Sequence, residues 1–439
     1  MSTPAPAGER ASDFREGGGR AVFTLTVVTL LYILNFMDRM VLSVSLPLIK
    51  QDLGLTDAQC GLLGTLVYLT VAVLIIPVSV LLDRWSRKGA ISIVAFLWSI
   101  ATCWTGASTA AAGLFVARAG VGIGEAGFAP GGMAFVSASF PERARAKVAG
   151  VFTLGQPLGT LLGIALAGYA AQANLFGLGW RAPFYAFSVP GVILAVLILF
   201  TRDYKTTEIV YASSGQQKLS LWQGILEVLR TPTLLFASFG AGAVAFAGNA
   251  VLHWMPTYFV RVRGITVAQA SALVGVVILF ALMGPILGGM AADRWKRRRA
   301  NARPLTAAVL ACLFGLLFYL GLFLDRHEMF SASFVVFILF AVVGFAGVAP
   351  AYSVSQDMVP RSLRSISMGV LVLITYGTLG AYSPLIVGWL SDILGTPGSP
   401  DLGAAFLFLP LICFLGAFLF FTAARFHDRD IRRLGESSV

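Results

Sequence analysis

Twelve long apolar stretches dominate this chain of 439 residues and constrain what it can fold into. About 20 consecutive apolar residues suffice to cross the hydrocarbon core of a bilayer as a helix. Hydrophobic residues make up 57% of the chain and charged residues only 12%, which excludes a disordered chain and an ordinary soluble enzyme. We predict an all-α integral membrane protein with twelve transmembrane helices. The stretches run approximately over 21–47, 59–82, 90–108, 112–138, 148–171, 183–201, 233–259, 267–291, 304–324, 331–354, 365–391 and 403–424.

The basic residues are distributed unevenly between alternate loops, and this predicts the orientation. With the N-terminus in the cytoplasm, the inner segments hold 25 Lys and Arg and the outer segments hold five. Cytoplasmic loops are enriched in positive charge, so we expect a multi-pass protein of a bacterial inner (plasma) membrane with both termini in the cytoplasm. The first twenty residues contain no cleavable-signal pattern, so the first span would act as its own insertion signal.

The net charge of +11 and the four cysteines fit the same interpretation. Basic loops of a membrane protein lie against anionic lipid headgroups, so we expect membrane lipids as partners and no nucleic acid. The cysteines are far apart and have no His beside them in the sequence, which argues against a metal site or a redox motif. We therefore expect no metal and no cofactor.

A repeated motif divides the chain into two halves. Residues 83–88 read Asp-Arg-Trp-Ser-Arg-Lys and residues 293–298 read Asp-Arg-Trp-Lys-Arg-Arg, at an offset of 210 residues. The longest polar loop lies between the sixth and seventh stretches. The predicted divisions are a cytoplasmic tail over 1–20, a six-helix bundle over 21–201, a linker over 202–232, a second six-helix bundle over 233–424 and a tail over 425–439.

The repeated loop resembles the signature of the major facilitator superfamily, Gly-x-x-x-Asp-Arg/Lys-x-Gly-Arg-Arg/Lys. The second copy, over 289–298, fits except that Lys296 replaces a Gly, and the first copy has Ser79 and Ser86 where Gly is usual. That family's fourth-span signature, Arg-x-x-x-Gly-x-Gly, is matched over 118–124. The resemblance covers nearly the whole chain. It implies two pseudo-symmetric six-helix bundles with a substrate site between them, alternating access, and function as a monomer.

Shorter strings resemble two branches of that superfamily. Residues 35–39, 122–126, 140–143 and 246–254 look like the Spinster-like branch, whose animal members move lysophospholipids and sphingosine phosphate. The Asp-Arg pair within 35–39 is also similar to the anion:cation symporters, which import sugar acids and other carboxylates. We favour the Spinster-like branch because of the string Gly-Ile-Gly-Glu-Ala over 122–126. The resemblance implies proton-coupled transport of an amphipathic anion such as a lysophospholipid or a sphingosine-phosphate-like lipid; the alternative is a proton-coupled symporter of small organic anions (sugar acids or aromatic carboxylates).

Four charged residues fall well inside the predicted spans, namely Asp38, Arg39, Arg118 and Glu125. Each charge at bilayer depth costs at least ~2.5–3.5 kcal/mol on insertion scales, so such residues are functional by default. We predict that Asp38 or Glu125 takes up a proton and releases it when Arg118 or Arg39 moves back toward the carboxylate. The alternative is a pair of ion pairs that only hold the first and fourth spans together.

Polar and aromatic side chains in spans of both halves are candidates for binding the substrate. Arg118 would hold an anionic group, and Asn249 and His253 share one face of the seventh span because they are four residues apart. For His253 the alternative is a structural hydrogen bond, and for the tyrosines it is packing. The predicted substrate-binding residues are Asn35, Arg118, Asn249, His253, Tyr352 and Tyr376.

The charged loop motifs are predicted to form a gate at the cytoplasmic face. Opposite charges and helix ends can hold that face closed in one of the two states of a transporter. The alternative is that the basic residues only determine topology. The predicted gate residues are Asp83, Arg84, Arg87, Asp293, Arg294, Arg297, Arg143 and Arg364.

Other functional classes lack their chemistry in this sequence. The chain has three His and no His-Glu-x-x-His, Gly-x-Ser-x-Gly or P-loop motif, so neither hydrolysis nor ATP-driven pumping is supported. We therefore predict no catalytic residues and no enzymatic activity. A channel would need a filter or a ring of charges from repeated subunits.

Overall fold

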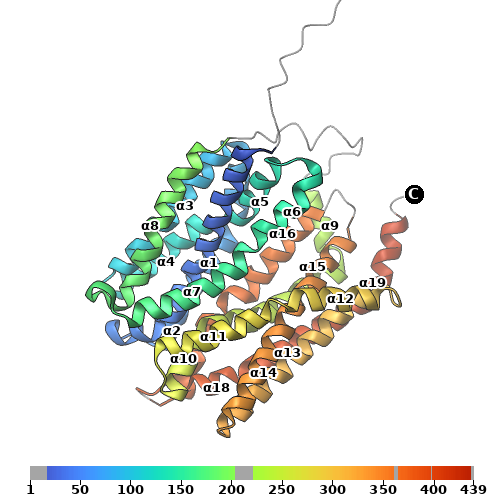
Figure 1. Cartoon of the computed structure of the whole chain (residues 1–439). Coiled ribbons are helices and arrows are strands. Elements are labelled where there is room, and N and C mark those ends of the chain that lie inside the picture. Colours follow the sequence, from blue (N-terminus) through green and yellow to red (C-terminus); the bar gives the residue numbers. More distant parts are fainter. Residues whose placement is uncertain (1–16, 203–220, 360–363, 397, 437–439) are drawn as a thin grey trace, which may run out of the picture.

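The computed structural model describes residues 17–202, 221–359, 364–396 and 398–436, and these residues fold almost entirely into helices. The helices before the central polar loop form one group (Figure 1). They are α1 (Gly19–Leu53), α2 (Asp57–Arg84), α3 (Arg87–Ala107), α4 (Ala111–Glu125), α5 (Phe128–Ala138), α6 (Glu142–Thr153), α7 (Gly155–Gln172), η1 (Leu175–Gly177), η2 (Gly179–Arg181), α8 (Ala182–Leu197) and η3 (Ile198–Phe200).

The helices after the central loop form a second group. They are α9 (Leu221–Leu229), α10 (Pro232–Arg263), α11 (Val267–Ala281), α12 (Gly284–Lys296), α13 (Ala302–Arg326), α14 (Phe330–Ala346), α15 (Val348–Asp357), α16 (Arg364–Ile374), η5 (Thr375–Leu379), η6 (Gly380–Tyr382), α17 (Ser383–Leu394), α18 (Leu402–Phe406) and α19 (Phe408–Glu436). Of these segments, η5 is a π-helical turn. The two groups are called below the N-terminal half and the C-terminal half. The domain boundaries drawn from the sequence remain predictions, since most of the predicted linker lies outside the described residues.

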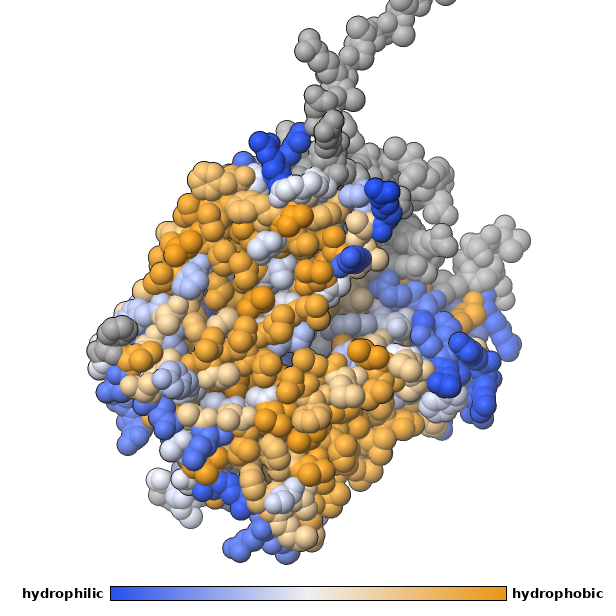
Figure 2. Space-filling view, viewed as in Figure 1, coloured by the Kyte–Doolittle hydropathy of each residue, from blue (hydrophilic) through white to orange (hydrophobic). Residues whose placement is uncertain are grey.

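Eleven helical segments in the described residues are long and apolar enough to cross a membrane. The remaining predicted stretch, 112–138, is divided into α4 and α5 by Gly127, whose φ of 74° is a left-handed conformation that glycine adopts easily. The last stretch is longer than predicted, because α19 continues past residue 424 to Glu436. On the face that Figure 2 shows, apolar side chains cover most of both halves and hydrophilic side chains gather at the ends, as expected of a protein surrounded by lipid.

The internal repeat extends to the caps of the helices. α1 and α10 both end at a glycine in the left-handed conformation, Gly54 (φ 61°) and Gly264 (φ 62°). The next helix begins in both halves with a threonine capping box, Thr56 with Gln59 and then Thr266 with Gln269, which satisfies the free N–H groups of the first turn. The same local chemistry therefore turns the chain in the same way in each half.

The two halves meet tightly at the end of the molecule opposite the chain termini, a contact called here the distal seam. The seam is centred on the buried carboxylate of Asp57 in α2, which receives two hydrogen bonds of 2.6 Å from Arg261 of α10 and one of 2.7 Å from the Ser391 hydroxyl of α17. Lys50 adds an ion pair at 2.5 Å. Asp392 in turn accepts the backbone N–H of Asp57 at 3.0 Å. These contacts join charges of both halves, so this end is closed.

Asp57→Asn is expected to loosen the distal seam, because it leaves Lys50 and Arg261 without their shared carboxylate. Removing one partner of a buried ion pair is strongly destabilising. We expect the population with an open distal end to rise at least about tenfold, which corresponds to ~1.4 kcal/mol. Distances between spin labels at Gln51 and Leu394, measured by pulsed electron resonance, would report this change.

Asp52→Asn is the matched control. Asp52 is more exposed and pairs at 2.9 Å with Arg181 of its own half, so its loss should leave the distance distribution unchanged. An unchanged distribution in Asp57→Asn would show that the carboxylate does not hold the seam.

Candidate functional site

The four intramembrane charges lie together in the N-terminal half. Arg39 of α1 contacts Glu125 of α4, with both Nε and Nη2 2.8 Å from the same carboxylate oxygen. The Glu125 side chain is fully buried and that of Arg39 is 19% exposed. Such a charge-assisted pair is strong where water is excluded.

The glycines of α4 allow this helix to approach its neighbours closely enough to form the pair. A Cβ on Gly124 would lie 2.4 Å from the backbone nitrogen of Trp98 in α3, and one on Gly122 would lie 2.8 Å from the carbonyl oxygen of Val67 in α2. No larger side chain fits without moving a helix. The fourth-span glycines therefore pack α4 closely against α2 and α3, and Glu125, the last residue of α4, is reached by the long Arg39 side chain of α1.

Asp38 and Arg118 are buried without such compensation. Asp38 is 2% exposed and accepts one hydrogen bond of 3.1 Å from Thr102 of α3, while its second oxygen has no partner. Arg118 is 1% exposed, and its Nε and Nη1 have no hydrogen-bond partner among the described residues. A small cavity of about 20 Å³ lies beside Arg118, also lined by Arg39 and Tyr68. Uncompensated buried charges are costly, so a ligand or proton that supplies the missing contact would be bound favourably.

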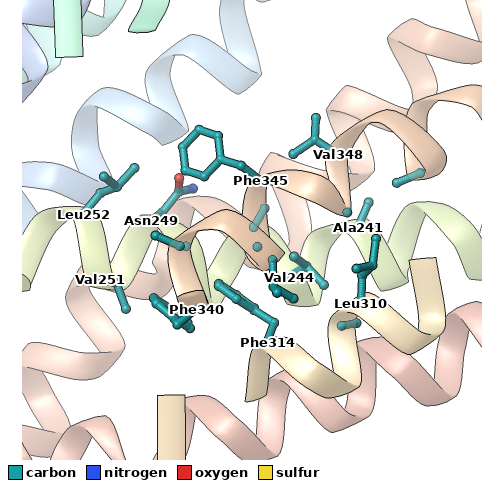
Figure 3. A pocket seen from close by; sticks show the side chains of 18 of the residues that line it. Ala241, Val244, Asn249, Val251, Leu252, Leu310, Phe314, Phe340, Phe345 and Val348 are labelled. Carbon is teal, nitrogen blue, oxygen red and sulfur yellow. The ribbon is translucent and has the colours of Figure 1, made fainter. Parts of the chain in front are cut away.

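The C-terminal half has a larger, mainly apolar cavity of about 270 Å³. Its walls come mainly from α10, α11, α13, α14 and α15, and Gln156 of α7 contributes from the other half. Figure 3 shows apolar side chains such as Val244, Phe314 and Phe340 around it, with Asn249 on one wall. Asn249 Nδ2 also donates to the carbonyl of Gly380 at 3.1 Å. This cavity suits an apolar group with few polar anchors.

Two tyrosines connect the charge cluster to the apolar cavity. Tyr376, which lines the cavity, stacks on Tyr68 of α2 with ring centroids 6.2 Å apart. The Arg39 guanidinium lies 5.7 Å from the Tyr68 ring and 5.1 Å from the Phe36 ring, which are cation–π distances. Tyr352 also lines the cavity. The analysis of the sequence missed Tyr68, because a single tyrosine in an apolar span has no distinguishing pattern.

Asn35 and His253 take different places. Asn35 is 3% exposed in α1 and lies beside the Glu125 carboxylate. His253 does not line the large cavity; its Nε2 lies 3.3 Å from the carbonyl oxygen of Cys60, and Ser43 donates to its backbone carbonyl at 2.8 Å. Both partners belong to the N-terminal half, so His253 lies between the halves at the small cavity beside Arg118. Within the described ranges no three His, Cys, Asp or Glu side chains are arranged to hold a metal ion.

The predicted gate residues surround the end of the molecule that carries the termini. Asp83 and Arg84 are in the last turn of α2 and Arg364 begins α16, but their side chains are outside the described residues. Arg87 is buried at the start of α3, whereas Arg143, Arg294 and Arg297 are exposed.

Asp293 pairs with Arg303 of its own half at 3.4 Å, and Arg303 also bonds Asp357, a residue that the sequence did not single out. The printed sequence gives no signal for Asp357, because its role depends on the packing of α15 against α12. The gate remains a prediction.

Residues 28–381 match the Major Facilitator Superfamily. An MFS-type efflux pump of Mycolicibacterium smegmatis is 28% identical over 98% of this chain and 99% of that protein. A probable galactarate/D-glucarate transporter of Bacillus subtilis is 25% identical over 85% of this chain and 86% of that protein.

A solved bacterial homologue of the human lysosomal transporter Spinster, inward-facing and unoccupied, has a TM-score of 0.78 at 24% identity and covers 94% of this chain and 99% of its own. At this identity the likeness concerns the fold alone. It confirms the predicted fold class.

Gly124→Ala is expected to destabilise the protein, because the added methyl group would force α4 away from Trp98. Overpacking of this kind costs about 1–3 kcal/mol, so the apparent melting temperature of the purified protein should fall by several degrees. Gly150→Ala in α6 is the control, since nothing lies within 4 Å of its Cβ position. Equal melting temperatures for both variants would contradict the close approach of α3 and α4.

Proposed function

Because the chain belongs to the Major Facilitator Superfamily, we propose that it moves an amphipathic anion, such as a lysophospholipid or a sphingosine-phosphate-like lipid, by proton-coupled alternating access. The superfamily membership predicted from the loop motifs is confirmed. The chain is an integral multi-pass membrane protein and a secondary transporter of small molecules, not an enzyme. The proposal therefore concerns its cargo and its coupling.

The observation that carries the proposal is the junction of the charge cluster and the apolar cavity. Arg118 and Arg39 lie on one side of the stacked Tyr68–Tyr376 pair, and a cavity lined by Phe314, Phe340 and similar side chains lies on the other. An anionic headgroup would bind at the arginines, and an acyl chain would occupy the cavity. A sugar acid would leave the apolar cavity unused.

The route into the site also suits a lipid. Figure 2 shows a hollow between the two halves on the side where Figure 1 labels α12. The surface beside the hollow is largely apolar (Figure 2). Cargo that is dissolved in the membrane would reach the site through this hollow without crossing a polar vestibule.

We propose that Asp38 and Glu125 couple protons to the cargo. In the present state Glu125 holds Arg39, and Asp38 has one unpartnered oxygen. A proton on Glu125 would release Arg39 toward an anionic headgroup, and loss of that proton would draw Arg39 back. The deprotonated Glu125 carboxylate and the anionic headgroup would thus compete for Arg39, so binding of a proton would favour binding of the cargo, which couples their movements.

The predicted orientation completes the proposal. If both termini lie in the cytoplasm, the distal seam is on the outer side and the cavity is open toward the inside. We propose that this is the inward-facing state of a monomer in a bacterial plasma membrane. The solved Spinster homologue described above is also named as inward-facing.

The second candidate is a proton-coupled symporter of small organic anions. The similarity to a galactarate/D-glucarate transporter favours it, and the buried Arg118, whose Nε and Nη1 have no hydrogen-bond partner among the described residues, would hold a carboxylate equally well. The apolar cavity distinguishes the candidates, since it adds binding energy only to a cargo with a hydrocarbon chain.

Proton movement in liposomes that contain the purified protein tests the coupling. Addition of a lysophospholipid is expected to start proton flux, and Asp38→Asn is expected to abolish it because the side chain can no longer exchange a proton. Asp401→Asn, at the exposed N-cap of α18, is the control and should retain the flux. Flux with glucarate alone would favour the symporter, and unchanged flux in both Asp38→Asn and Glu125→Gln would refute the coupling role.

Val244→Phe tests where the acyl chain binds. The larger ring would fill part of the cavity, so the KM for a lysophospholipid with a long chain should rise at least about fivefold, and short chains should be affected less. The KM for small carboxylates should not change. Val276 is 39% exposed on the outer face of α11, so Val276→Phe adds the same bulk outside the cavity. An equal effect of both variants would show that the acyl chain binds elsewhere.

A further inference from the structure

The two copies of the repeated loop motif have different surroundings. In the first copy Arg87 is 6% exposed. Lys88 Nζ donates to the carbonyl oxygens of Leu199 at 3.1 Å and Thr201 at 3.5 Å, where the sixth span ends. Arg87 and Lys88 are thus held against their own half.

The second copy has no equivalent acceptors, because the twelfth span does not end there. α19 continues as a helix to Glu436, so its carbonyl groups are occupied by helical hydrogen bonds. Asn301, which follows this copy, donates a hydrogen bond of 3.3 Å to the carbonyl oxygen of Ala424 in this helix. Arg297 and Arg298, the counterparts of Arg87 and Lys88 at an offset of 210 residues, are exposed.

The extension of α19 presents a basic surface beside this loop. Leu411, Leu415 and Phe418 are exposed on one face of α19. At the same helical spacing the face continues with Arg425 and Arg429, which are also exposed. The face changes from apolar to basic within two turns, as expected of a helix that passes from the hydrocarbon core of a bilayer into its headgroup region.

The end of α12 shows the same change. Ile286 and Met290 are 67% and 55% exposed, and the exposed Arg294 follows four residues later on the same face. The exposed Arg297 and Arg298 lie in the turn directly after the helix. Figure 2 shows the resulting hydrophilic patch beside the apolar surface, at the side where Figure 1 labels α12 and α19. We call the exposed Arg294, Arg297, Arg298, Arg425 and Arg429 the α12–α19 patch.

Aromatic and hydrogen-bond contacts hold the patch in place. The buried carboxylate of Asp430 accepts the backbone N–H of Thr233 at 3.0 Å and its hydroxyl at 2.7 Å, which fixes the extension of α19 to α10. The guanidinium of Arg425 lies 4.8 Å from the Phe421 ring and that of Arg429 lies 4.9 Å from the Phe426 ring. Ordering these arginines for a ligand therefore costs little entropy.

The neighbouring carboxylates leave the patch with excess positive charge. Asp357 is bound by Lys296 and Arg303, and Arg303 also contacts Asp293. Asp430 pairs with Arg429 of the patch at 3.3 Å, and Asp428 contacts His427 at 3.0 Å. Within the described part of the chain no ion pair neutralises Arg294, Arg297, Arg298 or Arg425, and a phosphate is the anion that several arginines bind well.

We propose that the α12–α19 patch binds the phosphate of an anionic phospholipid, whose acyl chains lie along the exposed apolar faces of α12 and α19. The adjoining apolar side chains favour a lipid over a free phosphate, which would leave them without a partner. The site is on the outer surface of the C-terminal half and uses none of the residues proposed to bind cargo. It is a site for a resident lipid and is independent of what the protein transports.

The test measures binding of phosphatidylglycerol to the full chain in phosphatidylcholine nanodiscs by native mass spectrometry. R298Q/R425Q is expected to lower the affinity at least about fivefold, because each arginine near the surface contributes to the attraction. R298K/R425K should keep most of the affinity, since the charges remain. R20Q/K147Q removes two exposed cations from the same end of the N-terminal half and should change the affinity less than about twofold.

Two results would overturn the proposal. Equal losses in R298Q/R425Q and R20Q/K147Q would show that phosphatidylglycerol responds only to net charge, and no loss in either would show that the patch does not bind it. Glycerol phosphate is added at the concentration that saturates the site with phosphatidylglycerol. Equal competition by this soluble phosphate would mean that the acyl chains contribute nothing and that the ligand is not a lipid.

Discussion

The ion pair between Arg39 and Glu125 is the interaction on which the arrangement of the N-terminal half depends. Charges in the hydrocarbon layer are tolerated only when a partner supplies the contacts that water would give. That requirement links α4 to α1 through the long Arg39 side chain, while the glycines of α4 let it pack closely against α2 and α3. Asp38 and Arg118 are buried nearby, and among the described residues their side chains lack some hydrogen-bond partners. The half is thus stabilised by one close ion pair and holds two further charges that could bind a ligand or a proton.

The two halves share a backbone plan and differ in chemistry. In each half the first long helix, α1 or α10, ends at a glycine, and the next helix begins with a threonine cap. The described spans of the C-terminal half nevertheless surround an apolar cavity where the N-terminal half has charges. The loop motif has diverged in the same way, since Lys88 is bonded inside its half and Arg298 is exposed. Duplication supplied two similar scaffolds, and the differences between them create a site with one polar and one apolar side.

Features that depend on the local sequence could be predicted, and features that depend on contact between the halves could not. Helical spans follow from hydropathy, and the four intramembrane charges stand out because they are rare. The break at Gly127 was missed, because this stretch contains several glycines and nothing in the sequence distinguishes the one at which the helix breaks. Asp57 was missed because its sequence indicates only a helix start, whereas its role arises when α10 brings Arg261 to it. Tyr68 gains its importance from Tyr376 of the other half in the same way.

The position of α2 suggests how these separate features act together. One helix carries Asp57 at the distal seam, Tyr68 beside the charge cluster and Asp83 at the end near the chain termini. Its 28 residues span about 42 Å at 1.5 Å per residue, which is more than the thickness of the hydrocarbon core. A change at the Tyr68–Tyr376 contact therefore acts near the middle of α2, a helix that reaches both ends of the molecule. Because α2 packs on α17 along the contact between the halves, tilting it would open one end as it closes the other, which is the geometric requirement for alternating access.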